Sequence, residues 1–117
     1  MKYLPGTHII ASLQAESTDL LHIHKEFREK IDLLIAHFKL QKLGEVYHDF
    51  SPAGFTAVIC LSESHISIHT WPEHKLVNLD IYLSNFQRNN DGTVESIYHE
   101  IKGFFNATVT KEQIIIR

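Results

Sequence analysis

The chain has 117 residues, of which 44% are hydrophobic and 21% are charged, and its formal net charge at pH 7 is −3. This length and composition are typical of one globular domain spanning residues 1–117, and the slight negative charge gives no basic surface for nucleic acid. No apolar run approaches the ~18 residues that cross a bilayer, and the opening MKYLPG lacks the apolar core of a secretory signal. We therefore expect a cytoplasmic protein that binds neither nucleic acid nor membrane.

The first part of the chain predicts a strand followed by a long helix. A strand-like run from His8 to Leu13 follows the Pro5-Gly6 turn. Apolar residues then recur at three- and four-residue steps, which predicts an amphipathic helix from about Thr18 to near Leu40. Ser17 or Thr18 is expected to cap its N-terminus, with Asp19 in the first turn.

The middle of the chain predicts an antiparallel sheet. Four strand-like runs follow one another closely, at residues 43–50, 55–61, 65–71 and 76–83. The first two are joined by the turn signal Ser51-Pro52-Ala53-Gly54. A second amphipathic helix is predicted from Thr93 to Phe105, and the β-branched segment from Ala107 to Ile116 predicts a last strand.

This order of elements predicts an α+β fold, in which an antiparallel sheet carries both helices on one face. The other face of the sheet then needs a cover, because large exposed apolar patches are uncommon on monomers. We expect this face to be buried in a homodimer, which gives an αββα sandwich.

One short run, SESHISIHTWPE at residues 62–73, concentrates three serines, two histidines and two carboxylates. Strand alternation places Ile66 and Ile68 on one face, with His65 and His69 on the other. Two histidines four residues apart chelate a metal on a helix, but on a strand they are ~13 Å apart, so no metal site is predicted. A hydrolase nucleophile at Ser67 is also disfavoured, because the glycine-flanked elbow is missing.

The same run resembles the processing site of the short prokaryotic S-adenosylmethionine decarboxylases, which are pyruvoyl enzymes of polyamine (spermidine) synthesis. The segments GTHIIA, HDFSPAGFTAVICLSESH and LDIYLSN also resemble family segments in the right order and spacing. The resemblance implies a zymogen that cuts itself between Glu63 and Ser64. The products would be a β chain of residues 1–63 and an α chain of residues 64–117.

The resemblance implies that Ser64 starts this cleavage and becomes a pyruvoyl group. Its hydroxyl attacks the preceding carbonyl, the resulting ester undergoes β-elimination, and hydrolysis of dehydroalanine leaves the pyruvoyl ketone. That ketone would form a Schiff base with a substrate amine and accept the electrons released with carbon dioxide. His69 matches a histidine that assists processing, and Thr56 stands where the family usually has a second processing serine. Ser64 and His69 are ~16 Å apart on an extended strand, so direct contact requires a turn.

The resemblance also implies a nucleoside pocket. Phe50 and Trp71 match family positions at which aromatic residues lie near adenine. Glu73 matches a position at which a carboxylate can accept hydrogen bonds from the ribose hydroxyls. The residue expected to protonate the product is a cysteine in the family and Ser84 here, and an alcohol is a far weaker acid than a thiol. Cys60, the single cysteine, is expected to be a buried small hydrophobe and no substitute.

Three hypotheses follow from these residues. The leading one is decarboxylation of S-adenosylmethionine. The second keeps the pyruvoyl chemistry but decarboxylates arginine or ornithine, with Glu73 or Asp80 facing the basic group of the substrate. The third is an unprocessed, non-catalytic homologue that regulates an active partner.

Overall fold

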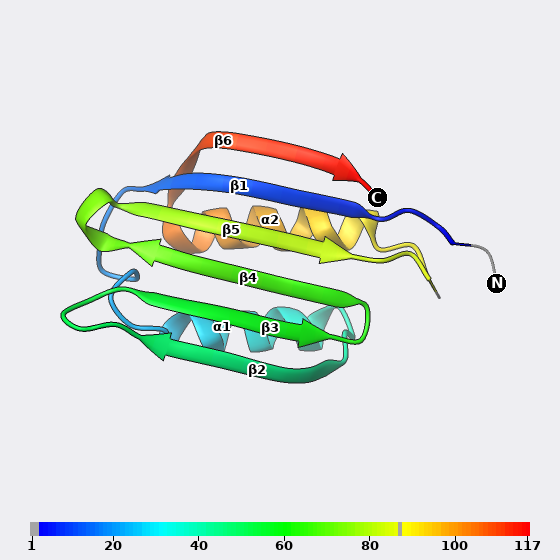
Figure 1. The fold of residues 1–117 in the computed structure, drawn as a ribbon, viewed down its shortest axis with the longest axis horizontal. Helices are drawn as coiled ribbons and strands as arrows, with labels where there is room; N and C mark the ends of the chain where they lie inside the picture. Colours follow the sequence, from blue (N-terminus) through cyan, green and yellow to red (C-terminus); the bar gives the residue numbers. More distant parts are fainter. Residues whose placement is uncertain (1–2, 87) are drawn as a thin grey trace.

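A computed structural model describes residues 3–86 and 88–117 of the chain, and Figure 1 shows its elements. In chain order these are β1 (Thr7–Ala15), α1 (Lys25–His37), β2 (Lys42–Asp49), β3 (Phe55–Leu61), β4 (Ser64–Trp71), the short 3₁₀ helix η1 (Pro72–His74), β5 (Leu76–Leu83), α2 (Asp91–Phe105) and β6 (Ala107–Ile116). The strands form one sheet in the order β2-β3-β4-β5-β1-β6, and every neighbouring pair is antiparallel.

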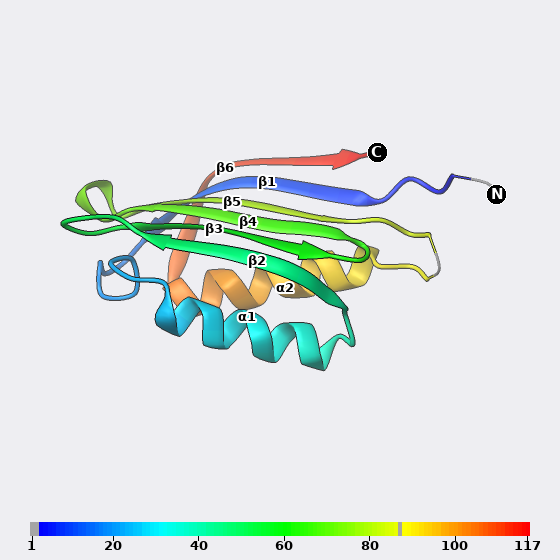
Figure 2. The ribbon, with the colours of Figure 1, turned by 60° about the horizontal axis from the view of Figure 1, so that its bottom comes forward.

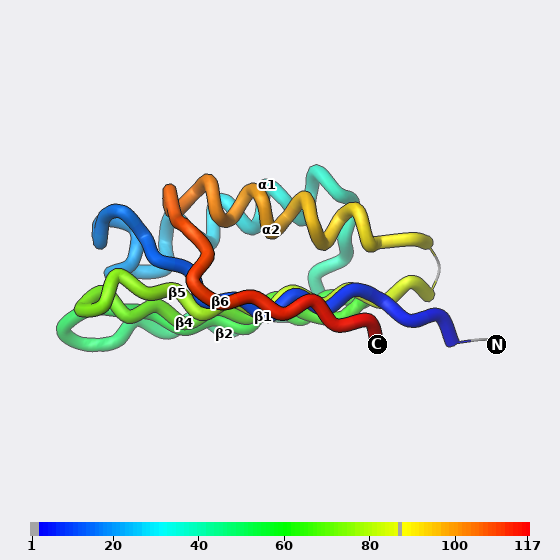
Figure 3. Tube along the Cα trace, turned by 90° about the horizontal axis from the view of Figure 1, so that it is seen from above, coloured from blue at the N-terminus to red at the C-terminus, as the bar shows by residue number. Residues whose placement is uncertain are grey.

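Both helices lie on the same face of the sheet, as Figure 2 shows from below and Figure 3 shows from above. The predicted α+β fold is therefore confirmed. Side chains that alternate along the strands fill the space between sheet and helices, where Phe27 of α1 packs on Phe55 of β3 and on Phe105 of α2. No helix within the described residues is both long and apolar enough to cross a bilayer.

The start of α1 differs from the prediction. The helix begins at Lys25, not near Thr18. The carbonyl groups of Leu21 and His22 accept hydrogen bonds from the Thr70 hydroxyl (2.8 Å) and from the N–H of Gly54 (2.9 Å). Because these carbonyls are bound to a residue of β4 and to the turn between β2 and β3, the segment before Lys25 follows the sheet as turns.

The predicted caps at Ser17 and Thr18 are wrong for the same reason. The Ser17 hydroxyl accepts the N–H of Asp19 (3.1 Å) within a local turn and caps no helix. His24 occupies the N-cap position, where its own N–H and its Nδ1 both contact Asp49 Oδ1 at 2.9 Å. The helix therefore starts where the chain is anchored to the end of β2.

The face of the sheet opposite the helices is open. Its exposed apolar side chains include Ile10, Val46 and Val58. Cys60 also lies exposed on this face, so the expectation of a buried cysteine is wrong. The reason is strand parity, since Ile59 and Leu61 on either side take the inner positions and force Cys60 outward.

Candidate active site

The bond between Glu63 and Ser64 lies in the tight hairpin between β3 and β4. Ser64 has a φ of +144°, a backbone conformation that a non-glycine residue adopts only under strain. The carbonyl oxygen of Glu63 accepts a hydrogen bond from the backbone N–H of Ser84 at 2.7 Å. One side of the predicted cleavage bond is thus strained, while its carbonyl is held by a fixed donor.

The side chain of Glu63 is fixed as well. Arg88 Nε contacts its two carboxylate oxygens at 3.2 and 3.4 Å, and the amide of Asn90 donates to Oε2. Asn90 is 1% exposed, and the same amide donates to the Ser84 carbonyl at 2.8 Å. Asn90 therefore joins Glu63 to Ser84 from inside the protein.

The Ser64 hydroxyl contacts a histidine that the sequence did not single out for processing. Ser64 Oγ lies 3.1 Å from Nδ1 of His65. His65 is half-buried, and this burial, more than any nearby charge, lowers its pKa from the ordinary value. The signal available in the sequence was adjacency alone, which does not say where an imidazole points.

His65 belongs to a polar cluster that includes His8 of β1 and Asp80 of β5. A donor atom from each of the three lies within 4.8 Å of the others. His8 is already satisfied, because its Nε2 contacts Asp80 Oδ1 (3.2 Å) and its Nδ1 contacts Arg117 Nη1 (3.4 Å). A guanidinium at this position opposes a bound cation, so we assign no metal to the cluster.

At the other end of β4, the residues predicted for the nucleoside pocket lie together. The ring of His69 is 5.4 Å from that of Phe50 and 4.5 Å from that of Trp71. These three side chains and Glu73 line a pocket of about 210 Å³. Phe50 and Trp71 are 40% and 41% exposed, so neither is a core residue.

Thr56 lies beside this pocket, since it is the cross-strand neighbour of His69 on β3. Its hydroxyl donates to the carbonyl of Ile68 at 3.2 Å. The two residues predicted to assist processing are therefore cross-strand neighbours, and neither forms a hydrogen bond with Ser64 in this structure.

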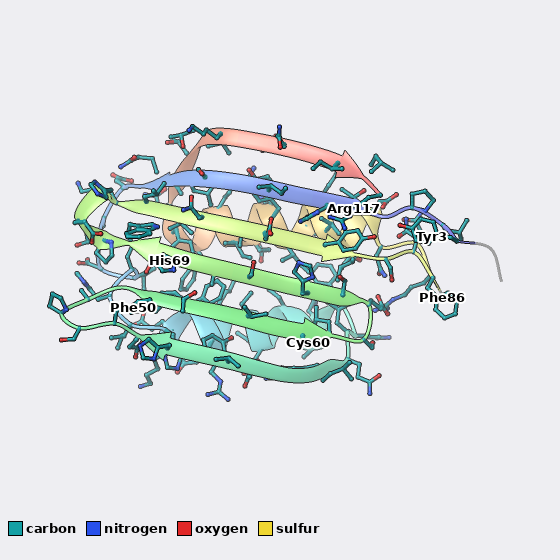
Figure 4. All side chains as sticks on the ribbon, in the orientation of Figure 1. Tyr3, Phe50, Cys60, His69, Phe86 and Arg117 are labelled. Atoms are coloured by element: carbon teal, nitrogen blue, oxygen red, sulfur yellow. The ribbon has the colours of Figure 1, made fainter. Side chains whose placement is uncertain are left out.

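The structure separates Ser64 from His69 within one chain. β4 is continuous from Ser64 to Trp71, with no turn in it, so the two residues are about 16 Å apart at the usual rise of a strand. Figure 4 shows His69 and Phe50 near one end of the sheet and Cys60 and Arg117 near the other, and Cys60 is the cross-strand neighbour of His65, the residue after Ser64. We call the residues around the predicted cleavage bond the cleavage site (Glu63, Ser64, His65, Ser84) and the second group the aromatic pocket (Phe50, His69, Trp71, Glu73).

A family model described as S-adenosylmethionine decarboxylase matches residues 7–117. The chain belongs to the S-adenosylmethionine decarboxylase family. The S-adenosylmethionine decarboxylase proenzyme of Archaeoglobus fulgidus is 43% identical over 77 residues, which are 66% of this chain and 69% of that protein. The proenzyme of Thermoplasma volcanium is 34% identical over 115 residues, 98% of this chain and 86% of the relative. The aligned part spans 57% of the Aquifex aeolicus proenzyme, at 42% identity over 66% of this chain.

A solved structure agrees with the family assignment. The crystal structure of the adenosylmethionine decarboxylase from Aquifex aeolicus superimposes with a TM-score of 0.78 at 30% sequence identity, covering 100% of this chain and 91% of that one. The resemblance found in the sequence is thereby confirmed, and so is the α+β class of the fold, while the homodimer stays a prediction. The short family motif lies in this structure on β4 and on the turns that flank it.

Proposed function

We propose that this chain is a self-processing, pyruvoyl-dependent S-adenosylmethionine decarboxylase that cuts itself between Glu63 and Ser64. The observation that carries the proposal is the geometry of that bond. A hydroxyl lies on the residue that follows the carbonyl, the backbone at Ser64 is strained, and the Ser84 N–H is bound to the carbonyl oxygen. A peptide bond with these three features is prepared for attack by the adjacent hydroxyl.

The chemistry of cleavage uses atoms that the chain itself provides. The Ser64 hydroxyl loses its proton and attacks the carbonyl carbon of Glu63, the C–N bond breaks, and the freed nitrogen takes a proton. The product is an ester between Glu63 and the Ser64 side chain. Loss of the Ser64 Cα proton then expels the Glu63 carboxylate, and one water replaces the nitrogen, which leaves as ammonia.

The residues around position 64 fit a pyruvoyl group. Ser64 is the serine from which the group would form, and the Ser84 N–H donates a hydrogen bond to the carbonyl of Glu63, the acyl group that would leave. Such a ketone condenses with a substrate amine and withdraws electrons from the bond to the carboxylate. Ser84 lies at the cleavage site through its backbone, where its hydroxyl would return a proton to the product carbon. An alcohol performs this step poorly, so turnover should be slow.

The aromatic pocket would hold the nucleoside. Phe50 and Trp71 offer ring faces for adenine, and the Glu73 carboxylate offers acceptors for ribose hydroxyls. The pocket of about 210 Å³ is smaller than the ~300 Å³ at which small-molecule sites usually begin, so a second surface is needed to close it.

A homodimer supplies that second surface. The open face of the sheet exposes apolar side chains that include Ile10, Val46 and Val58, as expected of an interface. A twofold axis that places two open faces together allows the cleavage site of one copy to face the aromatic pocket of the other. This arrangement unites Ser64 with His69, from which a single chain separates it by about 16 Å, and with Trp71, which lies still farther along β4.

The two other hypotheses have less support. For an arginine or ornithine decarboxylase, Glu73 or Asp80 would face the basic substrate group, but the Asp80 carboxylate binds His8 at 3.2 Å and Glu73 shares its pocket with the rings of Phe50 and Trp71. A regulatory homologue that is never processed does not require a strained Glu63–Ser64 bond with a hydrogen-bonded carbonyl. The cytoplasm is the compartment that suits the enzyme, since a reducing environment keeps the exposed Cys60 thiol unpaired.

The first experiment measures the mass of the purified chain under denaturing conditions and then its turnover on S-adenosylmethionine, arginine and ornithine. We expect two fragments that meet at the Glu63–Ser64 bond, a blocked N-terminus on the second fragment, and turnover on S-adenosylmethionine alone. Ser64→Ala should remain intact and inactive with an unchanged fold. An intact wild-type chain contradicts self-processing, and turnover on arginine or ornithine alone contradicts the substrate.

The two-copy site has its own test. Ser64→Ala and Trp71→Ala each damage every site of a homodimer. When the two variants are co-expressed, each mixed dimer regains one site with an intact Ser64 and an intact Trp71, and random pairing restores about a quarter of the wild-type turnover measured at substrate concentrations well below KM. If both residues served from the same chain, mixing would restore nothing.

A further inference from the structure

His65 lies where it can take part in the first proton transfer of self-cleavage. The cleavage reaction begins when the Ser64 hydroxyl gives up its proton, so the base must lie within hydrogen-bond reach of Oγ. Nδ1 of His65 is 3.1 Å from that oxygen. Among the described residues, no other side chain forms a hydrogen bond with Ser64 Oγ.

Other nearby bases are engaged elsewhere. The Glu63 carboxylate binds Arg88 and Asn90, and the Asp80 carboxylate binds His8. His69, which matches the processing histidine of the family, lies about 16 Å along the strand in the same chain and reaches Ser64 only from a second copy. The first step therefore has a base within the chain that is cut.

The surroundings of His65 suit a base that gains and then returns a proton. His8 from β1, Tyr82 from β5 and Arg117 from the end of β6 lie around its ring, and Cys60 is its cross-strand neighbour on β3. Burial is the largest influence and lowers the pKa of His65, with smaller contributions in the same direction from His8 and Arg117.

The remaining charge near the ring acts in the opposite direction. An Asp80 carboxylate oxygen lies within 4.8 Å of the His65 donor atom, and this negative charge raises the pKa. The imidazole is therefore neutral at pH 7 and ready to accept a proton, while Asp80 stabilises the imidazolium that forms for a moment.

We propose that His65 is the general base that activates Ser64 for self-cleavage. The inference rests on the proposed self-processing and names the residue that begins it. The Ser64 hydroxyl proton moves to His65 Nδ1 as Oγ bonds to the Glu63 carbonyl carbon, and the Ser84 N–H binds the oxygen that becomes negative. His65 then returns the proton to the Ser64 nitrogen as the C–N bond breaks. His69 acts afterwards, at the elimination step.

The test separates the two steps by trapping the ester. Freshly synthesised full-length chains are incubated with and without hydroxylamine, which cleaves esters but leaves peptide bonds intact, and the fragments are followed by mass. His65→Gln should slow cleavage by ~10²- to 10⁴-fold in both conditions, because the ester does not form. His69→Gln should slow unaided cleavage but cleave readily with hydroxylamine. The matched control is His99→Gln, at an exposed position on α2, which should cleave like wild type.

The pH dependence gives a second readout that does not depend on the folding of a variant. Because the base must be neutral, hydroxylamine-assisted cleavage of the wild type, measured at a constant concentration of unprotonated hydroxylamine, should fall as the pH drops through the pKa of His65, which lies below the ordinary 6.5. His65→Gln should lose this dependence. A flat wild-type profile between about pH 4.5 and 8, or a His65→Gln chain that cleaves at the wild-type rate, overturns the role of His65 while self-processing stands. A wild-type chain that never cleaves overturns both.

Discussion

Gly6 connects the stability of the fold to the geometry of the cleavage site. A Cβ added at this position would lie 2.3 Å from the carbonyl oxygen of Leu83 and 3.1 Å from the Cα of Ser84. Both contacts are with backbone, which cannot rotate away as a flexible side chain does. Gly6→Ala must therefore push the end of β5 away from the N-terminal segment, and Ser84 is the residue whose N–H binds the Glu63 carbonyl.

The cost can be worked out from the contacts. Overpacking of this kind costs about 1–3 kcal/mol. Gly6 also exchanges two backbone hydrogen bonds with Arg117, at 2.6 and 2.9 Å, and weakening them adds about 1 kcal/mol. A total near 3 kcal/mol lowers the melting temperature of a domain of this size by roughly 10 °C.

The assay is thermal unfolding followed by circular dichroism at a fixed protein concentration. It uses Ser64→Ala as the parent, because a chain that cuts itself does not unfold in a simple two-state manner. Gly103→Ala is the matched control, since Gly103 is exposed on helix α2 with open space around its Cβ position, and alanine there should stabilise by about 1 kcal/mol. In a chain with Ser64 intact, Gly6→Ala should also slow self-cleavage. A Gly6→Ala melting temperature within a degree of the parent would refute the packing argument.

Two further predictions concern turnover. Ser84→Cys should raise turnover on S-adenosylmethionine, because a thiol of pKa near ~8.5 is a better acid than an alcohol. The rate of self-cleavage should not change, since the backbone N–H of residue 84 remains in place. Carbon dioxide release measures turnover, and fragment mass measures self-cleavage. Unchanged turnover would exclude residue 84 from proton delivery. Trp71→Ala should raise KM for S-adenosylmethionine by about tenfold, since base–aromatic stacking contributes about 1–3 kcal/mol, while Ser64 is still processed. A KM equal to that of the wild type would show that the aromatic pocket does not hold the nucleoside.

The alternation of apolar and polar residues along the strands determines which side chains face the helices. Alternation along β4 placed Ile66 and Ile68 inside, and the structure buries both, while His65 and His69 lie on the open face. Alternation is a local property of an extended chain, so it can be read from spacing alone. The proposed cleavage pair, Glu63 and Ser64, rests on the resemblance to the decarboxylase family, and the chemistry of the acyl shift requires the hydroxyl that the second residue carries.

The long-range contacts could not be read in this way. The start of α1 was misplaced because Leu21 and His22 bind residues of β4 and of the turn after β2, and the apolar spacing of a helix contains no trace of those partners. Cys60 was expected inside because cysteine is commonly buried, but the inner positions on β3 belonged to its two neighbours.

Part of the site could be predicted from the sequence, and part became visible only in the tertiary structure. The family resemblance of the sequence supplied Ser64 and the aromatic and acidic residues Phe50, Trp71 and Glu73, which line one pocket in the structure. Only the tertiary structure showed that Ser64 and His69 are separated by an unbroken strand, and that His65 contacts the Ser64 hydroxyl. The contact between His8 and Asp80, 72 residues apart, depends on the pairing of β1 with β5. Strand register is set by the packing of the whole sheet against its helices, and so the surroundings of the reacting groups emerge only when the chain is folded.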